Sequence, residues 1–140
     1  MLKGTLLHPE LLKALAAAGH GSQVLVADGN YPMATRVRNG AAVIYLNLRP
    51  GLVKATDVLQ TIAEHVPIQE AYVMQPEDGS EPVIFAEFAR LLGGVPLERV
   101  DRASFYGMAS GPNLAVAVAT GEERVFGNIL LTIGVVSRDQ

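Results

Sequence analysis

Apolar residues in this chain of 140 residues fall into short runs, separated by glycine, proline or charged residues. The first clear run, QVLVA over 23–27, is too short for a helix, rich in valine and flanked by glycines, so it predicts a buried strand. Similar runs predict further strands over 42–48, 71–74, 113–119 and 129–136. Asp28 directly follows the first strand, where packing alone does not require a carboxylate.

Four helices are predicted where apolar residues recur at helical spacing beside residues that favour a helix start or stop. Their limits are Pro9 and Gly19 for the first, a cap at Thr56 or Asp57 and a stop before Pro67 for the second, Pro82 and Gly93–Gly94 for the third, and a cap at Asp101 for the fourth. Helices thus alternate with apolar strands. We therefore expect an α/β fold with one domain over residues 1–140, built as a three-layer αβα sandwich around a largely parallel or mixed sheet.

Composition excludes several classes of function. A net charge of −3 and a pI of about 5.5 argue against a nucleic-acid partner, which favours clustered Lys and Arg. The absence of cysteine excludes disulfides and thiolate chemistry and favours a cytoplasmic location. No signal peptide is recognised, and no apolar run approaches the roughly 20 residues that span a membrane. We expect no membrane association.

Common catalytic and cofactor motifs are absent from the sequence. No G-x-G-x-x-G or phosphate-binding loop follows a strand, and no G-x-S-x-G is present, which disfavours nucleotide binding and serine catalysis. The histidines His8, His20 and His65 lack metal-ligand spacing, so no metal site is expected. The charged triplet 122–124 predicts a solvated turn. Phe85 and Phe88, close together on one predicted helix, predict core packing.

The motifs GHG, VADGNYP, DRASFY and TGEERVFGN occur in this order along the chain. Together they resemble one family, the L-fucose mutarotases and D-ribose pyranases, which interconvert anomers of free monosaccharides. The resemblance runs essentially end to end, from PELLKALAAAGHG to GNILLTIGV. DRASFY and FGNILL are more similar to the fucose branch, because the ribose branch usually carries a histidine in the region of Arg102.

The resemblance also implies which residues form the site. His20 resembles the residue that transfers protons. Asp28, Arg102 and the segment Phe126–Gly127–Asn128 resemble substrate-binding positions. The family typically has tyrosine where this chain has Phe126, so the phenol at that position is missing. Tyr31 and Tyr106, each within or beside a motif, are alternative sources of a hydroxyl.

The function implied is that of an isomerase that needs no cofactor, a mutarotase acting on L-fucose or a related 6-deoxy or aldohexose sugar. Opening the ring takes a proton from the anomeric hydroxyl and gives one to the ring oxygen. Imidazole, with an unperturbed pKa of about 6.5, suits both transfers. Two alternatives remain open: a monosaccharide-binding or sugar-transport-associated protein without catalysis, and a structural ring subunit without a ligand.

The spacing of His20 and Asp28 raises a geometric question. They are eight positions apart in the chain, so a fully extended connection places them up to about 26 Å apart, too far for one monosaccharide to bridge. Either the loop after Gly19 doubles back, or a neighbouring subunit completes each site. The resemblance implies a ring-shaped homo-oligomer, a pentamer or decamer, with sites near subunit contacts, which favours the second arrangement.

Overall fold

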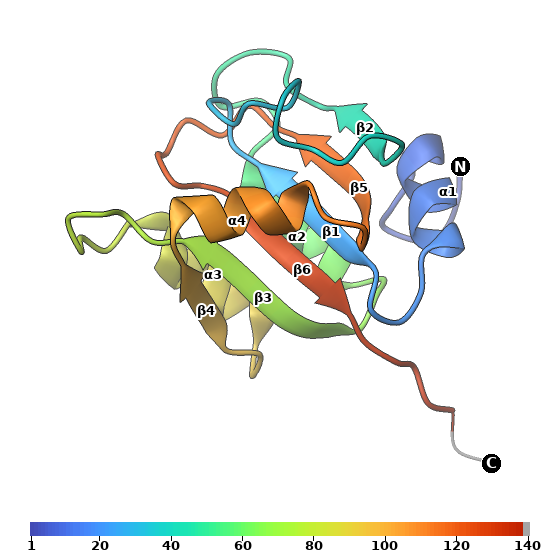
Figure 1. Ribbon diagram of the computed structural model, residues 1–140. Coiled ribbons are helices and arrows are strands. Elements are labelled where there is room, and N and C mark those ends of the chain that lie inside the picture. The colour runs from blue at the N-terminus through green and yellow to red at the C-terminus, as the bar shows by residue number, and fades with distance from the viewer. Residues whose placement is uncertain (139–140) are drawn as a thin grey trace.

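The computed structural model describes residues 1–138, and six strands within this range form one sheet (Figure 1). The strands are β1 (Gln23–Ala27), β2 (Ala42–Tyr45), β3 (Ile68–Met74), β4 (Leu97–Val100), β5 (Leu114–Ala119) and β6 (Ile129–Ile133). Their order across the sheet is β2-β5-β1-β6-β3-β4. β6 runs antiparallel to both of its neighbours, β1 and β3, whereas the other neighbouring pairs are parallel. Five strands therefore end at the same edge of the sheet, and β6 begins there.

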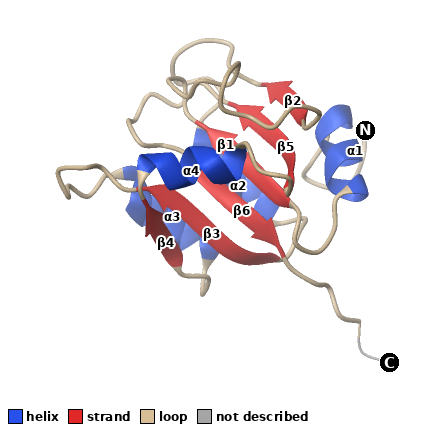
Figure 2. Ribbon diagram, in the orientation of Figure 1, coloured by secondary structure: helices blue, strands red, loops and turns tan. Residues whose placement is uncertain are grey.

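Four helices in the described range complete the fold: α1 (Pro9–Ala17), α2 (Ala55–Ala63), α3 (Ile84–Leu92) and α4 (Arg102–Ala109). Helices α2 and α3 cover one face of the sheet, and α4 crosses the opposite face (Figure 2). α1 lies beside β5 and β2, and its Leu11 joins the apolar cluster of α2 and α3. The predicted α/β class, the three layers and the mixed sheet are thus confirmed.

The core lies on both faces of the central strands. In β1, Val24 and Val26 pack with the cluster of α2 and α3, whereas Leu25 and Ala27 pack with that of α4. A strand buried on both faces reads as a continuous apolar run, which is why QVLVA was recognisable. On α3, Phe85 and Phe88 are buried, so the prediction of core packing for this pair is confirmed.

Several element limits differ from the predictions. The second helix begins at Ala55 with Lys54 as its N-cap, and Asp57 lies in its first turn, where its Oδ2 accepts a hydrogen bond from Lys54 N at 3.2 Å. β2 ends at Tyr45 and β6 at Ile133, earlier than predicted. β4 was not predicted, because this short edge strand pairs only with β3 and two of its four residues are charged.

Helix α4 is anchored to the sheet by one aromatic residue. Phe105 is fully buried, and its ring centre lies 6.2 Å from that of Tyr31 in an edge-to-face arrangement. At the start of the helix, the predicted cap is confirmed, because Asp101 Oδ1 accepts a hydrogen bond from Ser104 N at 2.7 Å. Cap and anchor together fix the helix that carries Arg102.

We expect Phe105→Ala to lower the free energy of unfolding by about 3 to 5 kcal/mol, because the cavity left under α4 cannot be filled by the well-packed sheet. Urea denaturation followed by circular dichroism measures this loss. Val83→Ala, at a side chain 81% exposed, is the control and is expected to change stability by less than about 0.5 kcal/mol. Equal effects of the two substitutions would contradict this account of the core.

Candidate functional site

Asp28 follows β1 at the edge of the sheet where β6 begins. Its carboxylate is buried and accepts hydrogen bonds from three groups: Asn30 N at 2.9 Å, Gly127 N at 3.1 Å and Asn128 Nδ2 at 3.3 Å. In return, Asp28 N donates to Asn128 Oδ1 at 2.7 Å. Asn128, which directly precedes β6, is also buried. These contacts join the end of β1 to the start of its antiparallel neighbour.

The protonation of Asp28 reflects this burial. Loss of solvent around the carboxyl raises its pKa above the ordinary 3.8, and the negative charge of Glu122 raises it further. Hydrogen bonds from the backbone of Asn30, Gly127 and Tyr31 act in the opposite direction without cancelling the rise. Polar groups that donate hydrogen bonds to such a carboxylate strongly stabilise its ionised form.

A cavity of about 200 Å³ opens beside Asp28. Its lining residues come from the ends of β1 and β3, the first turns of α4 and the loop before β6. They are Asp28, Asn30, Tyr31, Met74, Arg102, Tyr106, Val125, Phe126 and Asn128. Four of the predicted site residues thus line one cavity, and Gly127 contributes its N–H to Asp28 at the wall. We take this cavity as the candidate site.

Arg102 and Tyr106 lie one helical turn apart on α4 and both face the cavity. Within residues 1–138, the side chain of the exposed Arg102 makes no hydrogen bond or ion pair, so its guanidinium is available to a ligand. The half-buried Tyr106 ring packs edge-to-face on Tyr31 at 5.6 Å and under the Arg36 guanidinium at 5.7 Å. Its hydroxyl has no hydrogen-bond partner in the described part of the chain.

Tyr31 differs from Tyr106 in how its hydroxyl is used. The Tyr31 side chain is buried, and its hydroxyl donates to the backbone carbonyl of Arg36 at 2.8 Å. Burial raises the pKa of the Tyr31 phenol well above its ordinary value of 10.0. Of the two tyrosines considered as hydroxyl sources, Tyr106 is therefore the one with a free donor in the cavity.

Phe126 stands at the turn that leads into the site. Its φ angle is +57°, in the left-handed region that side chains other than glycine rarely adopt. The half-buried ring packs against both apolar clusters and forms part of the cavity wall. The turn therefore presents an apolar ring next to the polar groups of Asp28 and Asn128.

His20 lies away from this cavity. It is exposed, and its Nε2 is 3.1 Å from Gln69 Oε1 near the start of β3. This is the opposite edge of the sheet from Asp28. Because a strand rises about 3.3 Å per residue, the five residues of β1 hold His20 and Asp28 more than about 16 Å apart. The chain does not bring its own His20 to its own cavity.

The charged triplet 122–124 was predicted to be a solvated turn, and this is wrong for Glu122. Its carboxylate is buried and accepts two hydrogen bonds at 3.0 Å from the Arg124 guanidinium, while Arg124 Nη1 lies 2.8 Å from Glu87 Oε2 on α3. Burial alone would raise the pKa of Glu122, but the contact with Arg124 outweighs it, so that pKa is lowered. The available signal in the sequence was an arginine two residues after an acid that closely follows an apolar strand.

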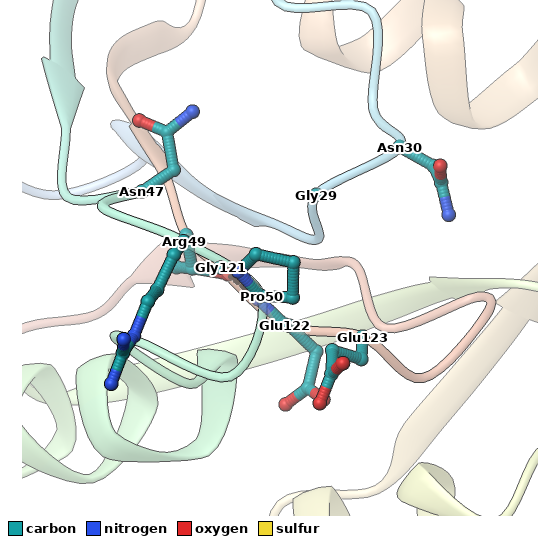
Figure 3. A pocket seen from close by; sticks show the side chains of 9 residues that line it. Gly29, Asn30, Asn47, Arg49, Pro50, Gly121, Glu122 and Glu123 are labelled. Atoms are coloured by element: carbon teal, nitrogen blue, oxygen red, sulfur yellow. Dashed lines mark hydrogen bonds between the residues drawn. The ribbon is translucent and has the colours of Figure 1, made fainter.

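A second cavity of about 390 Å³ lies on the other side of Gly29. Asn47 and Asn30 flank it, and the side chains of Glu122 and Glu123 point together to one side of their loop, away from Asn47 (Figure 3). None of the predicted site residues lines this cavity, although it is larger. It therefore ranks second as a ligand site.

Residues 1–138 contain no cluster of three or more His, Cys, Asp or Glu side chains that could hold a metal ion. Over the same range, no helix is both long enough and apolar enough to cross a membrane.

Comparison with known proteins identifies the family. The model of the RbsD / FucU transport protein family matches residues 1–136. The chain is 32% identical to the D-ribose pyranase of Symbiobacterium thermophilum, with 96% of this chain and 98% of that protein covered. It is 31% identical to the fucose mutarotase of Homo sapiens, with 97% and 95% covered. Relatives named for ribose and for fucose are thus about equally similar.

Solved structures give the same result. RbsD of Bacillus subtilis, complexed with D-ribose, matches with a TM-score of 0.85 at 25% identity and covers 98% of this chain and 100% of that one. The fucose mutarotase of Streptococcus pneumoniae, in complex with L-fucose, matches with a TM-score of 0.79 at 28% identity and covers 93% and 94%. Since the family model and these relatives extend over nearly the whole chain, the protein belongs to the RbsD / FucU family of sugar mutarotases, which are isomerases.

Proposed function

We propose that this chain interconverts the α and β anomers of a free monosaccharide, with L-fucose or a related 6-deoxy or aldohexose sugar as its substrate. The observation that carries the proposal is the buried Asp28 carboxylate, held by Gly127 and Asn128 at the wall of a small cavity. Solved relatives with D-ribose and with L-fucose support a monosaccharide as the ligand.

Recognition of the sugar rests on three polar side chains. Ionised Asp28 accepts hydrogen bonds from sugar hydroxyls, and Arg102, which lines the same cavity from α4, donates hydrogen bonds to sugar oxygens. Asn128, whose amide is engaged with Asp28, keeps that carboxylate in place. Together they fix the orientation of the ring and of its anomeric hydroxyl.

Phe126 supports the preference for a 6-deoxy sugar. An apolar ring in the cavity wall suits the C–H surface of a sugar and the methyl group at C6, where a hydroxyl would lack a partner. The similarity of DRASFY and FGNILL to the fucose branch points the same way. These two features favour L-fucose over D-ribose, although relatives of both kinds are equally similar overall.

The reaction needs two proton transfers and no redox change. A base removes the proton of the anomeric hydroxyl, an acid protonates the ring oxygen, the C1–ring oxygen bond breaks, and the ring closes again on the other face of C1. No cofactor is required by this balance. We assign the principal proton transfer to His20, whose imidazole offers a donor and an acceptor near neutral pH.

His20 must come from a neighbouring copy of the chain. Its imidazole is exposed at the edge of the sheet opposite Asp28, where its only hydrogen bond within residues 1–138 is with the exposed Gln69, so it is accessible to the cavity of another subunit. This geometry supports a ring-shaped homo-oligomer, a pentamer or decamer, in which each site combines His20 of one copy with Asp28 and Arg102 of the next.

Tyr106 is the second group that we assign to proton transfer. Its hydroxyl faces the same cavity as Arg102 and has no hydrogen-bond partner among residues 1–138. In this role it replaces the phenol that is missing at Phe126.

Exchange NMR on free L-fucose, L-rhamnose, galactose and D-ribose tests the activity. We expect wild-type protein to accelerate α-to-β exchange most for L-fucose, and His20→Ala to reduce the acceleration about 100- to 10,000-fold because the principal proton carrier is lost. A protein that binds sugar without catalysis would broaden the signals and leave the exchange rate unchanged. That result would favour the non-catalytic binding protein.

Shared sites are tested by mixing two impaired variants, His20→Ala and Asp28→Asn, after dissociation and reassembly, and by measuring exchange at a sugar concentration below KM, where each variant alone has low activity. Mixed rings contain some sites with both wild-type residues, so part of the activity is expected to return. If no activity returns in verified mixed assemblies, the claim that His20 and Asp28 of different copies form one site is contradicted.

The role of Tyr106 is tested by Tyr106→Phe, which removes only the hydroxyl. We expect kcat for anomer exchange to fall about tenfold or more, with KM little changed, because the hydroxyl acts in proton transfer. Tyr72→Phe is the matched control, since the Tyr72 hydroxyl donates to Glu70 at 2.9 Å outside the cavity lining. Unchanged kcat in Tyr106→Phe would remove this residue from the mechanism.

The raised pKa of Asp28 predicts a pH dependence of sugar binding. The ionised carboxylate accepts hydrogen bonds and the protonated form accepts them poorly, so the sugar Kd rises as the pH falls through the Asp28 pKa, which lies above 3.8. NMR measurement of the sugar Kd as a function of pH in a His20→Ala background tests this without any contribution from His20. Asp28→Asn is expected to bind about tenfold more weakly at neutral pH and to lose this acid limb. An acid limb that persists in Asp28→Asn would assign it to another group.

A further inference from the structure

A partly buried ion-pair bridge lies beneath the segment that forms the cavity wall. It consists of Glu122 after β5, Arg124 in the same loop and Glu87 on α3. The guanidinium of Arg124 donates through Nε and Nη2 to the two carboxylate oxygens of Glu122, each at 3.0 Å, and its Nη1 contacts Glu87 at 2.8 Å. The Glu122 side chain is 3% exposed, so this guanidinium provides the charge that makes its burial tolerable.

The bridge is in direct contact with Gly127. A Cβ atom at Gly127 would lie only 2.9 Å from Glu122 Cγ and equally close to the carbonyl oxygen of Arg124. The backbone of Gly127 is thus seated on the Glu122 side chain, and from there its N–H donates to Asp28 Oδ2. A shift of the Glu122 side chain would therefore displace the Gly127 N–H that donates to Asp28.

Glu122 is also tied to both neighbours of Asp28. Its carbonyl oxygen accepts a hydrogen bond from Gly29 N at 3.0 Å. Its N–H donates to Thr120 Oγ1 at 3.2 Å, and that hydroxyl donates to the carbonyl oxygen of Ala27 at 2.7 Å. The residues before and after Asp28 are therefore connected to the same buried acid.

Arg124 is the member of the bridge that contacts both carboxylates and neutralises their charge. Without its guanidinium, the Glu122 carboxylate would remain buried with no cationic partner, close to a second buried carboxylate at Asp28. It would have to take up a proton or turn toward solvent, and either change removes the surface on which Gly127 rests. The link to α3 through Glu87 would be lost as well.

We propose that Arg124 is a positioning residue for sugar binding: by holding Glu122 against Gly127 and fastening the loop to α3, it sets the geometry in which Gly127 and Asn128 hold the Asp28 carboxylate toward the substrate. This deepens the proposed function and rests on it. Arg124 itself lines neither cavity. Its effect on binding is transmitted through the backbone of the segment 126–128.

Arg124→Met tests the proposal, because it keeps the length of the side chain and removes the charge and the donors. We expect KM for anomer exchange to rise about tenfold with kcat changed by less than about twofold, since a grip that is loosened equally in the ground and transition states affects binding alone. The amide of Gly127 is expected to exchange its hydrogen faster. Arg124→Lys, which keeps the charge without the paired contact, is expected to restore part of the lost affinity.

Arg99→Met is the matched control. Arg99 pairs with Glu81 at 2.6 Å and lies over the Phe85 ring, so it also removes an arginine ion pair, yet it contacts neither Asp28 nor the segment 126–128. We expect KM to change by less than about twofold. A merely structural role of Arg124 would instead lower the folded fraction and thus the apparent kcat, with KM unchanged.

The outcomes separate this proposal from the proposed function. If the wild type is active and Arg124→Met has the same KM and the same Gly127 amide exchange rate, the role of Arg124 is overturned and the proposed function is not. A wild type that accelerates no sugar would overturn the proposed function, and the Gly127 amide would then still report whether the bridge holds the loop. If Arg124→Met does not fold, Glu122→Gln replaces it: raised KM with normal folding supports the proposal, and unchanged KM contradicts it.

Discussion

The reciprocal contact between Asp28 and Asn128 is the interaction on which the site depends. Each residue gives the other a backbone or side-chain hydrogen bond, and both are buried. The contact closes the gap between the end of β1 and the beginning of β6, two neighbouring strands that run in opposite directions. This connection, which also completes the sheet, fixes the direction of the Asp28 carboxylate, and burial raises its pKa.

The antiparallel insertion of β6 explains why the cavity forms at this edge. β6 begins where β1 and β3 end, so the loop before β6 meets the residues that follow β1 and the last residue of β3, Met74. α4 starts close by, after β4, and adds Arg102 and Tyr106. Segments that are about 100 residues apart in the chain are thereby brought to a single cavity. The same topology leaves His20 at the far edge, which is why the proposed mechanism calls on a neighbouring copy of the chain.

Much of the fold could be predicted because its local signals agree with its packing. β1 is buried on both faces and is a continuous apolar run, and the Asp101 cap is found where the sequence places it. β4 was missed because an edge strand with charged residues makes half of its backbone hydrogen bonds outside the sheet. Its sequence also shows no alternation of apolar and polar residues. Chain order alone also could not show that Glu122 is buried, since its partners are supplied by a turn and by α3.

The site residues divide in the same way. The family motifs pointed to Asp28, Arg102, Phe126 and Asn128, and the fold brings these four together. The choice between Tyr31 and Tyr106 required the structure, because it depends on which hydroxyl already has a partner. The spacing along the chain indicated that His20 and Asp28 could lie far apart, and in the structure they lie at opposite edges of the sheet.

A crystal structure of the protein with L-fucose shows which cavity the sugar occupies. We expect sugar oxygens within hydrogen-bond distance of the Asp28 carboxylate and the Arg102 guanidinium, with an imidazole from an adjoining copy near the anomeric carbon. A sugar found instead in the larger cavity beside Asn47 and Arg49, with Asp28 untouched, would contradict this expectation.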